Sequence, residues 1–322
     1  MPRIRREPDL TPFFEFCYGI ARRDQLVGAK TTDAYLRWRL ETGQWQVILP
    51  SVYALFQGDL TLEQRAFAGQ LHGGAASQIT GAAALRFLGL QYGPVAERIH
   101  ILVPPDKRVA SAPGFRVIRT ERLAEPTVID GLRLAPVVRA VADTLRERLD
   151  LRMARALVSE AVQSRAATVE EFEAEVADGP QRGSADFRRA VADVVGGARS
   201  APEAELRDLC RTSRVLPPVL WNPILRGPGD DHLLPIPDGW LDDVGLALEV
   251  DSREYHSSPE GWVRTLERHN KLTVLGVVVL HITPRDLRRD PGKVLALIER
   301  TYLELARKGN RHRVRRVSDR GA

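Results

Sequence analysis

The sequence lacks the features by which secreted and membrane proteins are recognised. Its two cysteines, Cys17 and Cys210, lie far apart and form no CxxC pair, so neither a disulfide framework nor a cysteine zinc site is predicted. The longest nearly uninterrupted apolar run, residues 272–282, is far shorter than the roughly 20 residues of a membrane-spanning helix. The basic N-terminus has no apolar core that would mark a secretory signal. We therefore expect a cytoplasmic protein with no membrane span.

The sequence also lacks the motifs of several large enzyme classes: it has no P-loop, no dinucleotide-binding glycine fingerprint, no HExxH and no GxSxG elbow. What remains is a chain of 322 residues that is 43% hydrophobic, long enough for two or three domains. The net charge is only +5, yet basic residues gather at 308–322. This segment is expected to be disordered, and it either aids solubility as a solvated tail or holds polyanions through phosphate contacts.

Composition divides the chain into four expected parts. The stretch GGARSAP combines two glycines, a serine and a proline just before a new helix, which favours a linker and the main domain boundary there. The expected parts are a winged helix-turn-helix domain at 1–62, a mixed α/β middle region ending in helices at 63–195, a nuclease-like domain at 196–307 and the basic tail at 308–322.

Residues 13–56 show the pattern of short helices followed by a β-ribbon. A threonine at 31 or 32 can cap a helix in which Leu36 and Leu40 share one face and which Gly43 ends. The stretch QWQVILPSVYAL then predicts two short strands broken at Pro50 and Ser51. Such a pattern is typical of a winged helix-turn-helix, although a small helical domain with a hairpin explains it equally well.

In a winged helix-turn-helix, the recognition helix would expose Tyr35, Arg37 and Arg39 towards DNA. The stretch RRDQLVGAK, the helix ending in Gly43 and the wing ending in SVYAL together resemble the N-terminal winged helix of AbiEi-type antitoxins. The alanine-rich stretch that follows, RIHILVPPDKR and VIDGLRLAPVVRAVADTL are similar to later parts of that family, so the likeness covers roughly residues 12–150. The resemblance implies DNA as a partner and, for an antitoxin, a cognate toxin. One departure is Ser51, where the family usually has glycine.

The stretch LALEVD sets two acids into an apolar strand. The strand period of two places Glu249 and Asp251 on one face. If DDVG forms a symmetric tight turn, Leu241 pairs with Leu246 and Asp238 lies directly across from Glu249. Like charges in opposite positions are destabilising, and oxygen ligands of this kind suit Mg²⁺ (or Mn²⁺). The alternative is that Asp238 faces water in a turn, Asp251 begins a loop and an arginine holds Glu249.

The neighbouring helices supply further candidates. Ser200 and Glu203 fit a capping box, which is a sufficient structural reason for Glu203. Arg264, Arg268 and Lys271 form a basic stripe on a predicted helix. That stripe is either a solvated face or, beside an acidic metal patch, a group that holds phosphate or stabilises transition-state charge.

The stretch GVVVLHIT at 276–283 predicts a strand buried on both faces, covered by the helix that follows it. This order of helix, hairpin, helix, strand and helix resembles the PD-(D/E)XK nuclease fold, in particular bacterial domains related to very-short-patch repair endonucleases, over roughly residues 198–306. The resemblance implies that Asp238 and Glu249 would ligate Mg²⁺, with Glu203 assisting through a water molecule. The further matching positions are Asp251, His256, Arg268 and TPRDL at 283–287.

Two positions depart from the nuclease pattern. Asp251 stands where the family has the lysine that orients the attacking water, and Ser252 replaces a usual glycine. His256, which falls where the repair endonucleases have an active-site histidine, could replace the lysine, as could Arg268 or Lys271. A lone histidine can equally be structural.

The predicted fold is therefore multi-domain α+β and α/β, with an N-terminal winged helix, a mixed middle region and a restriction-endonuclease-like mixed sheet flanked by helices. Two functions follow. The first is a Mg²⁺-dependent DNA endonuclease with an attached DNA-binding module. The second is a non-enzymatic antitoxin or transcriptional regulator with an inactive nuclease-like domain, which the absence of the lysine favours. The choice between DNA and RNA and the oligomeric state stay open.

Overall fold

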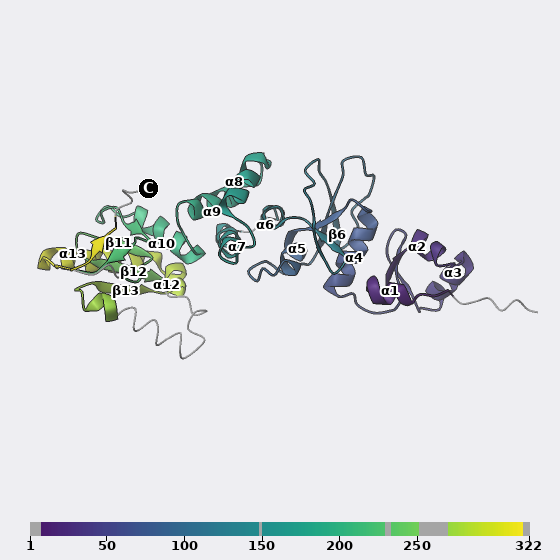
Figure 1. The fold of residues 1–322 in the computed structure, drawn as a ribbon, viewed down its shortest axis with the longest axis horizontal. Helices are drawn as coiled ribbons and strands as arrows, with labels where there is room; N and C mark the ends of the chain where they lie inside the picture. Colours follow the sequence, from purple (N-terminus) through teal and green to yellow (C-terminus); the bar gives the residue numbers. More distant parts are fainter. Residues whose placement is uncertain (1–7, 148–149, 229–232, 251–269, 318–322) are drawn as a thin grey trace, which may run out of the picture. The chain divides into compact units, whose positions relative to one another are not determined.

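The computed structural model is a mixed α/β structure with several sheets, as the multi-domain α+β expectation requires. The residues that the structure describes are 8–147, 150–228, 233–250 and 270–317. The chain divides into two compact units, Met1–Val191 and Ala192–Ala322 (Figure 1). Within the described ranges, no helix is both long enough and apolar enough to cross a membrane. Cys17 and Cys210 are free thiols, and burial raises the pKa of Cys210 to about 12.

The first unit begins with three short helices and an antiparallel sheet of order β1-β3-β2. These elements are α1 (Thr11–Phe16), β1 (Ile20–Arg22), α2 (Arg23–Gly28), α3 (Asp33–Glu41), β2 (Gln46–Leu49) and β3 (Val52–Ala54). Thr32 caps α3 by accepting a hydrogen bond from the Tyr35 backbone N–H at 3.2 Å, and Gly43 follows the helix with φ 66°. The predicted helix and the two predicted strands are thus confirmed. Side chains from all three helices form one core with Trp45 and Leu55.

The turn between β2 and β3 contains a strained residue. Ser51 has φ 63°, in the left-handed region that disfavours residues with a Cβ. Its carbonyl accepts a hydrogen bond from Arg23 N–H at 2.8 Å, which ties the turn to the start of α2. This conformation gives a physical reason why glycine is favoured at this position.

The rest of the first unit is a five-stranded mixed sheet followed by helices. Its sheet has the order β6-β5-β4-β8-β7. The elements are α4 (Leu62–Gly73), β4 (Gln78–Thr80), α5 (Gly81–Phe87), β5 (Ile99–Val103), β6 (Phe115–Arg119), β7 (Thr127–Ile129), β8 (Leu132–Leu134), α6 (Val137–Leu145), α7 (Leu151–Gln163), α8 (Val169–Asp178) and α9 (Ala185–Val195). Helix α4 approaches β5 so closely that a Cβ on Gly73 would lie 2.8 Å from Ile101 Cγ2. Only glycine permits that contact.

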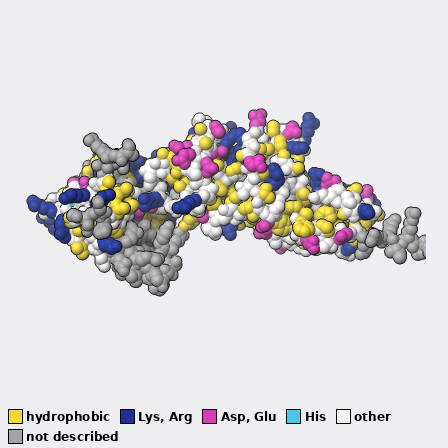
Figure 2. All heavy atoms as spheres, in the orientation of Figure 1, with side chains coloured by type: hydrophobic (Ala, Val, Ile, Leu, Met, Phe, Trp, Pro, Cys, Tyr) yellow, Lys and Arg dark blue, Asp and Glu magenta, His cyan; other side chains and the backbone are white. Residues whose placement is uncertain are grey.

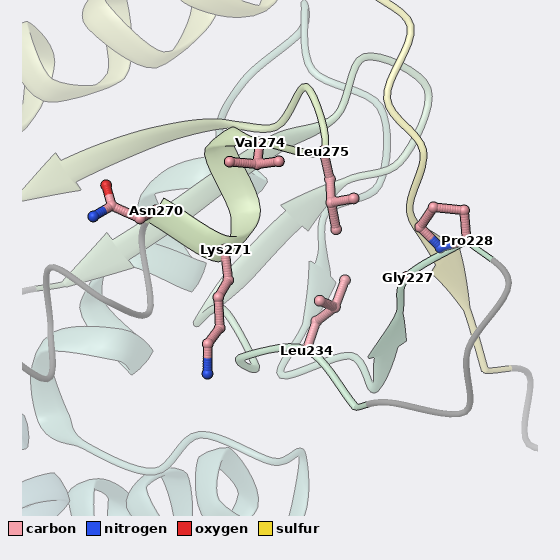
Figure 3. A pocket seen from close by; sticks show the side chains of 7 residues that line it. All are labelled: Gly227, Pro228, Leu234, Asn270, Lys271, Val274 and Leu275. Atoms are coloured by element: carbon pink, nitrogen blue, oxygen red, sulfur yellow. The ribbon is translucent and has the colours of Figure 1, made fainter.

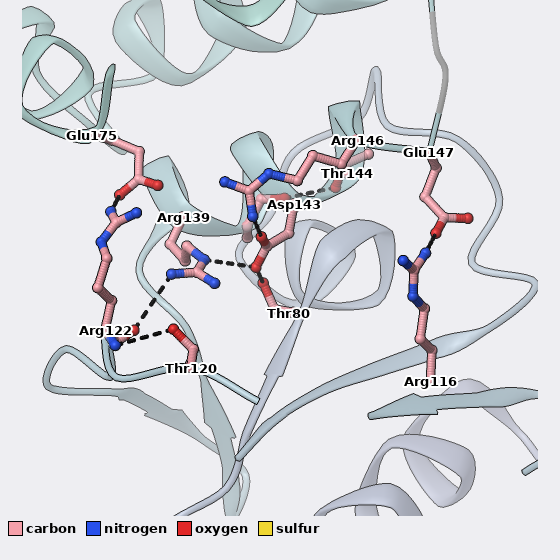
Figure 4. A network of polar contacts seen from close by, with 11 residues as sticks. Thr80, Arg116, Thr120, Arg122, Arg139, Asp143, Thr144, Arg146, Glu147 and Glu175 are labelled. Atoms are coloured by element: carbon pink, nitrogen blue, oxygen red, sulfur yellow. Dashed lines mark hydrogen bonds and ion pairs between the residues drawn. The ribbon is translucent and has the colours of Figure 1, made fainter. Parts of the chain in front are cut away.

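A buried network of charges joins β4, α6 and the segment after β6 (Figure 4). The carboxylate of Asp143, with a side chain 1% exposed, accepts hydrogen bonds from Thr80 Oγ1 at 2.9 Å and from Arg139 Nε at 2.8 Å. Arg146 donates to its other oxygen at 2.8 Å. Arg139 also donates to the carbonyl of Arg122 at 3.4 Å. Because the Asp143 carboxylate is removed from water, its charge depends on these partners.

The second unit is built on a four-stranded mixed sheet of order β13-β12-β11-β9. Strands β9, β11 and β12 are antiparallel neighbours, whereas β12 and β13 are parallel. The elements are α10 (Ala201–Arg211), β9 (Leu220–Trp221), β10 (Leu225–Arg226), β11 (Gly239–Leu241), β12 (Leu246–Val250), β13 (Val278–Ile282), α12 (Pro284–Arg289), α13 (Pro291–Lys308) and β14 (Arg315–Arg316).

Strand β12 has an apolar cluster on each face. One cluster joins Leu246 and Leu248 to residues of α10, α12 and α13. The other joins Ala247 to Trp240, Leu272 and Val314. The central strand is thus covered on both sides, which fixes the face that each of its side chains occupies.

Two expectations for this unit are wrong. Strand β13 is not buried on both faces: it lies at the edge of the described sheet, and Val278 and His281 are exposed. The residues up to 317 of the basic tail are not disordered, because β14 pairs with β10 and Val314 is buried. The burial of Val314 and the hydrogen bonds around it stabilise this segment in an ordered conformation. The high charge of the segment alone would not predict that order.

We predict that Ser51→Gly raises the unfolding free energy of the β2–β3 ribbon by up to about 1 kcal/mol. Glycine removes the penalty of the left-handed conformation, and this gain exceeds the extra chain entropy that glycine loses on folding. Hydrogen exchange of the β2 and β3 amides measures the change. Ser51→Ala is the control, since it keeps the strain and should change little. Unchanged or faster-exchanging amides in Ser51→Gly would contradict the assignment of strain to this turn.

We predict that Asp143→Asn destabilises the first unit by about 3–5 kcal/mol, because it leaves the buried Arg139 guanidinium without its counter-charge. Hydrogen exchange of the β4 and α6 amides in urea reports this unit separately. The control is Asp24→Asn, which breaks an exposed pair with Arg22 in the same unit and should cost at most about 1 kcal/mol. Equal effects of the two changes would refute a stabilising role for the network.

Candidate functional site

The hairpin β11–β12 has the register expected from a symmetric turn. Gly239 pairs with Leu248, Trp240 with Ala247, and Leu241 with Leu246. The turn at 242–245 ends at Gly245, whose φ of 64° suits a tight connection. Continued by one residue, the register sets Asp238 across from Glu249. The predicted pairing of Leu241 with Leu246 is therefore confirmed.

The Asp238 side chain is part of the end of this ladder. Its Oδ2 accepts a hydrogen bond from the Val250 backbone N–H at 2.7 Å. Its own carbonyl accepts from Asn222 N–H at 3.1 Å on the β9 side. Pro237 precedes it and has no N–H, so regular pairing of β11 begins only at Gly239. Asp238 is thus held beside the last residues of β12 and is not a solvent-facing turn residue.

Glu249 is 7% exposed and lies near the end of the central strand. Alternation along β12 places its side chain on the same face as Ala247, the face that Trp240 and Leu272 cover. The parallel strand β13 sets His281 directly beside Glu249 in the register. Asp238, Glu249 and His281 therefore occupy one row across three neighbouring strands.

Sequence reasoning does not identify His281 as a site residue. It follows four apolar residues in VVVLHI and alternates with Val279, so the pattern indicates only an apolar strand. The signal that identifies it is its register with Glu249, and that depends on β12 and β13 being parallel neighbours. Parallel pairing over a long crossover is not encoded in any short stretch of sequence.

The capping box predicted for Ser200 and Glu203 is half formed: the serine caps the helix, but the Glu203 carboxylate binds the N–H of the residue before the serine. Ser200 Oγ accepts from Glu203 N–H at 3.3 Å, and Glu203 Oε2 accepts from Arg199 N–H at 2.9 Å. Asn222 donates from its side-chain amide to Glu203 Oε2 at 3.5 Å and to the Gly197 carbonyl at 2.9 Å. Through Asn222, the start of α10 is connected to the strand end that holds Asp238. Helix α10 packs on the Leu246 face, opposite to the face of Glu249.

The remaining predicted catalytic residues are only partly visible. Asp251, His256 and Arg268 lie outside the described residues. Lys271 is exposed and lines a shallow hollow of about 510 Å³ with Asn270, Val274 and Leu275 from the same short helical segment and Leu234 across from them (Figure 3). The hollow includes neither Asp238 nor Glu249.

Within the described ranges, no three Asp, Glu, His or Cys side chains are grouped so that they could hold a metal ion. A Mg²⁺ ion commonly takes one or two carboxylates and completes its shell with water and phosphate. Two oxygen donors such as Asp238 and Glu249 suit that ion chemically. A carboxylate has about four acceptor positions, so the bond from Val250 to Asp238 is compatible with ligation.

The three residues predicted to face DNA on α3 differ in their exposure. Arg37 is exposed, but Tyr35 and Arg39 are half-buried. The guanidinium of Arg39 lies 4.9 Å from the Tyr35 ring centroid and 5.1 Å from that of Trp38, and its Nε donates to Tyr35 Oη at 2.9 Å. The expectation that all three are exposed is wrong. Tyr35 and Arg39 are four residues apart and share one helix face, whereas Arg37 is two residues from each and lies on another face.

Comparison with known proteins gives relatives without a described activity. The chain is 33% identical over 213 residues to the uncharacterised proteins Rv2248 and MT2308 of two Mycobacterium tuberculosis strains, covering 65% of this chain and 75% of each relative. A crystal structure of the RV2827C protein from Mycobacterium tuberculosis aligns with 66% of this chain and 86% of its own, at 18% identity and a TM-score of 0.39. No family model matches the sequence.

We predict that Asp238→Ala destabilises the end of β12 by about 1–2 kcal/mol, because the Val250 N–H loses its acceptor. Asp238→Asn retains an amide oxygen in the same place and should cost much less. Hydrogen exchange at Val250 separates the two, with protection lost in the alanine variant and kept in the asparagine variant. Equal protection in both would show that the side chain does not hold this N–H.

Proposed function

The chain belongs to the family of the uncharacterised Mycobacterium tuberculosis protein Rv2248, and we propose that it is a DNA-binding, Mg²⁺-dependent endonuclease. The observation that supports this most directly is the pairing of Gly239 with Leu248, which, continued by one residue, sets Asp238 across from Glu249 near the end of β12. Two carboxylates so placed are oxygen donors of the kind that Mg²⁺ takes.

The order of elements in the second unit supports the same proposal. Helix α10 precedes three antiparallel strands, and a crossover then leads to β13, which runs parallel to the central strand. This order is similar to that expected of a PD-(D/E)XK nuclease core, in which the acids would lie at the end of the central hairpin. The face that holds Glu249 also faces the short helical segment containing Leu272, next to Lys271.

We assign distinct roles to the residues of this site. Asp238 and Glu249 would hold Mg²⁺ (or Mn²⁺), and Glu203 would keep α10 and Asn222 in place instead of ligating the ion directly. The bound ion would lower the pKa of a ligated water and stabilise charge on the phosphate. His281 would hydrogen-bond the water or Glu249 and thereby orient the attack. Lys271, Arg268 and His256 are the candidates for the role of the missing lysine, whose position in the sequence Asp251 occupies.

The first unit would supply most of the DNA affinity. Its three helices and the β2–β3 ribbon follow one another in the order expected of a winged helix-turn-helix, in which α3 would be the recognition helix. Arg37 would contact DNA directly. Tyr35 and Arg39 would act indirectly, by fixing Trp38 and Trp45 in the aromatic cluster from which the exposed face of α3 projects.

The second candidate function is a DNA-binding antitoxin or transcriptional regulator with an inactive nuclease-like unit and, for an antitoxin, a cognate toxin as partner. The observation that favours it is Asp251, an acid where the nuclease pattern has its lysine. Such a protein would bind duplex DNA with the first unit but would not cut it, with or without metal.

The experiment is an assay of the purified chain on plasmid and single-stranded DNA with Mg²⁺, Mn²⁺ or EDTA. We expect metal-dependent cutting that falls by about a hundredfold or more in Asp238→Asn and Glu249→Gln, because each loses a charged ligand. The asparagine change at 238 keeps the hydrogen bond to Val250, so that loss of activity is not a consequence of unfolding.

Asp208→Asn is the control, since it removes one carboxylate charge from α10 of the second unit, where it pairs with Arg211, and should cut like the wild type. His281→Ala should lower the cutting rate while leaving DNA affinity unchanged. DNA binding without cutting by the wild type under every metal condition would exclude the nuclease and select the regulator.

A further inference from the structure

The last described residues of the chain form a row of exposed arginines on the second unit. Along residues 311–315 exposure alternates: Arg311, Arg313 and Arg315 are exposed, whereas His312 is half-buried and Val314 is buried. Such alternation is that of an extended segment with one face against the protein. Arg316 is also exposed, and together with Arg307 and Lys308 these residues form what we call the basic edge. Figure 2 shows Lys and Arg side chains gathered where the end of α13 lies.

The inward face of this segment is firmly attached. His312 Nε2 lies 2.6 Å from the Asp242 carbonyl oxygen, and its ring meets that of Trp240 edge-on at 5.3 Å between centroids. The contact requires Gly245, where a Cβ would lie 2.7 Å from His312 Cδ2. Asn310 donates to the carbonyls of Val244 and Gly276 at 2.8 and 3.2 Å. The arginines therefore project from a fixed backbone.

The described acids near residues 311–316 form no ion pair with the arginines of that segment. Asp242 accepts a hydrogen bond from Trp240 Nε1 at 2.8 Å, and Asp243 accepts one from Tyr302 Oη at 2.7 Å. Glu304 pairs with Arg307 and Lys308 at the end of α13. Among the described residues, no ion pair is seen for the four arginines of 311–316. Arg313 is the most constrained of them, because its Nη2 donates to the Val274 carbonyl at 2.9 Å.

We propose that the basic edge is a second DNA-binding surface, which contacts the phosphate backbone of duplex DNA independently of sequence. Alternate residues of an extended segment are about 6.8 Å apart, and the phosphates of one strand recur every ~3.4 Å of helix axis. Because the phosphates also turn around the axis, the distance between neighbours on one strand is longer than this rise and close to the arginine spacing. A segment laid along the DNA backbone can therefore bring one arginine to each successive phosphate. This inference rests on the proposed DNA binding of the chain, but it does not require cleavage.

The test uses the full chain and a short fluorescein-labelled DNA duplex of random sequence, in EDTA, with binding followed by anisotropy over a range of salt concentrations. We expect Arg311→Gln, Arg315→Gln and Arg316→Gln together to weaken binding by about tenfold to a hundredfold at moderate salt. The slope of log affinity against log salt should fall by about 0.9 for each phosphate that the variant no longer neutralises. Arg313 is left unchanged because its bond to Val274 is structural.

The matched control changes three exposed arginines of α12 and α13, Arg288, Arg289 and Arg300, to glutamine, so that the net charge falls equally. It should retain nearly the wild-type affinity and slope. Equal losses in the two triple variants would overturn the inference, because the effect would then follow net charge and not this surface. Equally effective competition by transfer RNA or polyglutamate would overturn duplex DNA as the partner.

The outcomes also separate this inference from the nuclease. If DNA binding depends on Arg311, Arg315 and Arg316 but no metal-dependent cutting occurs, the nuclease proposal is rejected. The proposal of the basic edge is then still supported. If the wild type cuts DNA but both triple variants bind DNA as tightly as it does, the nuclease is supported and the basic edge is rejected. Unchanged amide protection at Val314 in the triple variant shows that the loss is of charge and not of the docked segment.

Discussion

The second unit depends on burying β12 on both faces while keeping a carboxylate within it. Leu246, Ala247 and Leu248 are fully buried, and ladders on both sides satisfy their backbone groups. A polar side chain in such a strand must have partners or the fold loses stability. Glu249 is that side chain, and its partners can come only from the strand ends and helices around it. The fold therefore favours polar side chains at positions 238 and 281, which lie beside Glu249 on the neighbouring strands.

The parts that could be predicted from the sequence are those encoded locally. The cap at Thr32, the capping interaction of Glu203 and the register of the β11–β12 hairpin each depend on residues only a few positions apart. Hairpin register follows from the turn, and the turn follows from four residues ending in glycine. Short-range chemistry therefore identifies Asp238 and Glu249 as neighbours.

The parts that could not be predicted depend on tertiary packing. His281 becomes a neighbour of Glu249 only through a parallel pairing, and Arg39 is half-buried only because three aromatic rings converge around it. The high charge of the basic segment predicts disorder, yet one valine, one histidine and one asparagine hold it in place. Composition predicts whether a segment as a whole tends to be ordered. Whether it packs on the folded protein depends on a few residues that fit the surface beneath them.

The ladder between β10 and β14 affects the order in which the second unit is completed. Leu225 pairs with Arg316, whereas the strands of the β11–β12 hairpin are separated by four residues only. Closing a long loop costs more chain entropy, so we expect this pairing to form after the hairpin. The arginines are aligned only once the sheet beneath them exists. In a nascent or partly unfolded chain the same arginines would lie on a flexible segment with no fixed spacing. Only the folded second unit would hold them in a regular row.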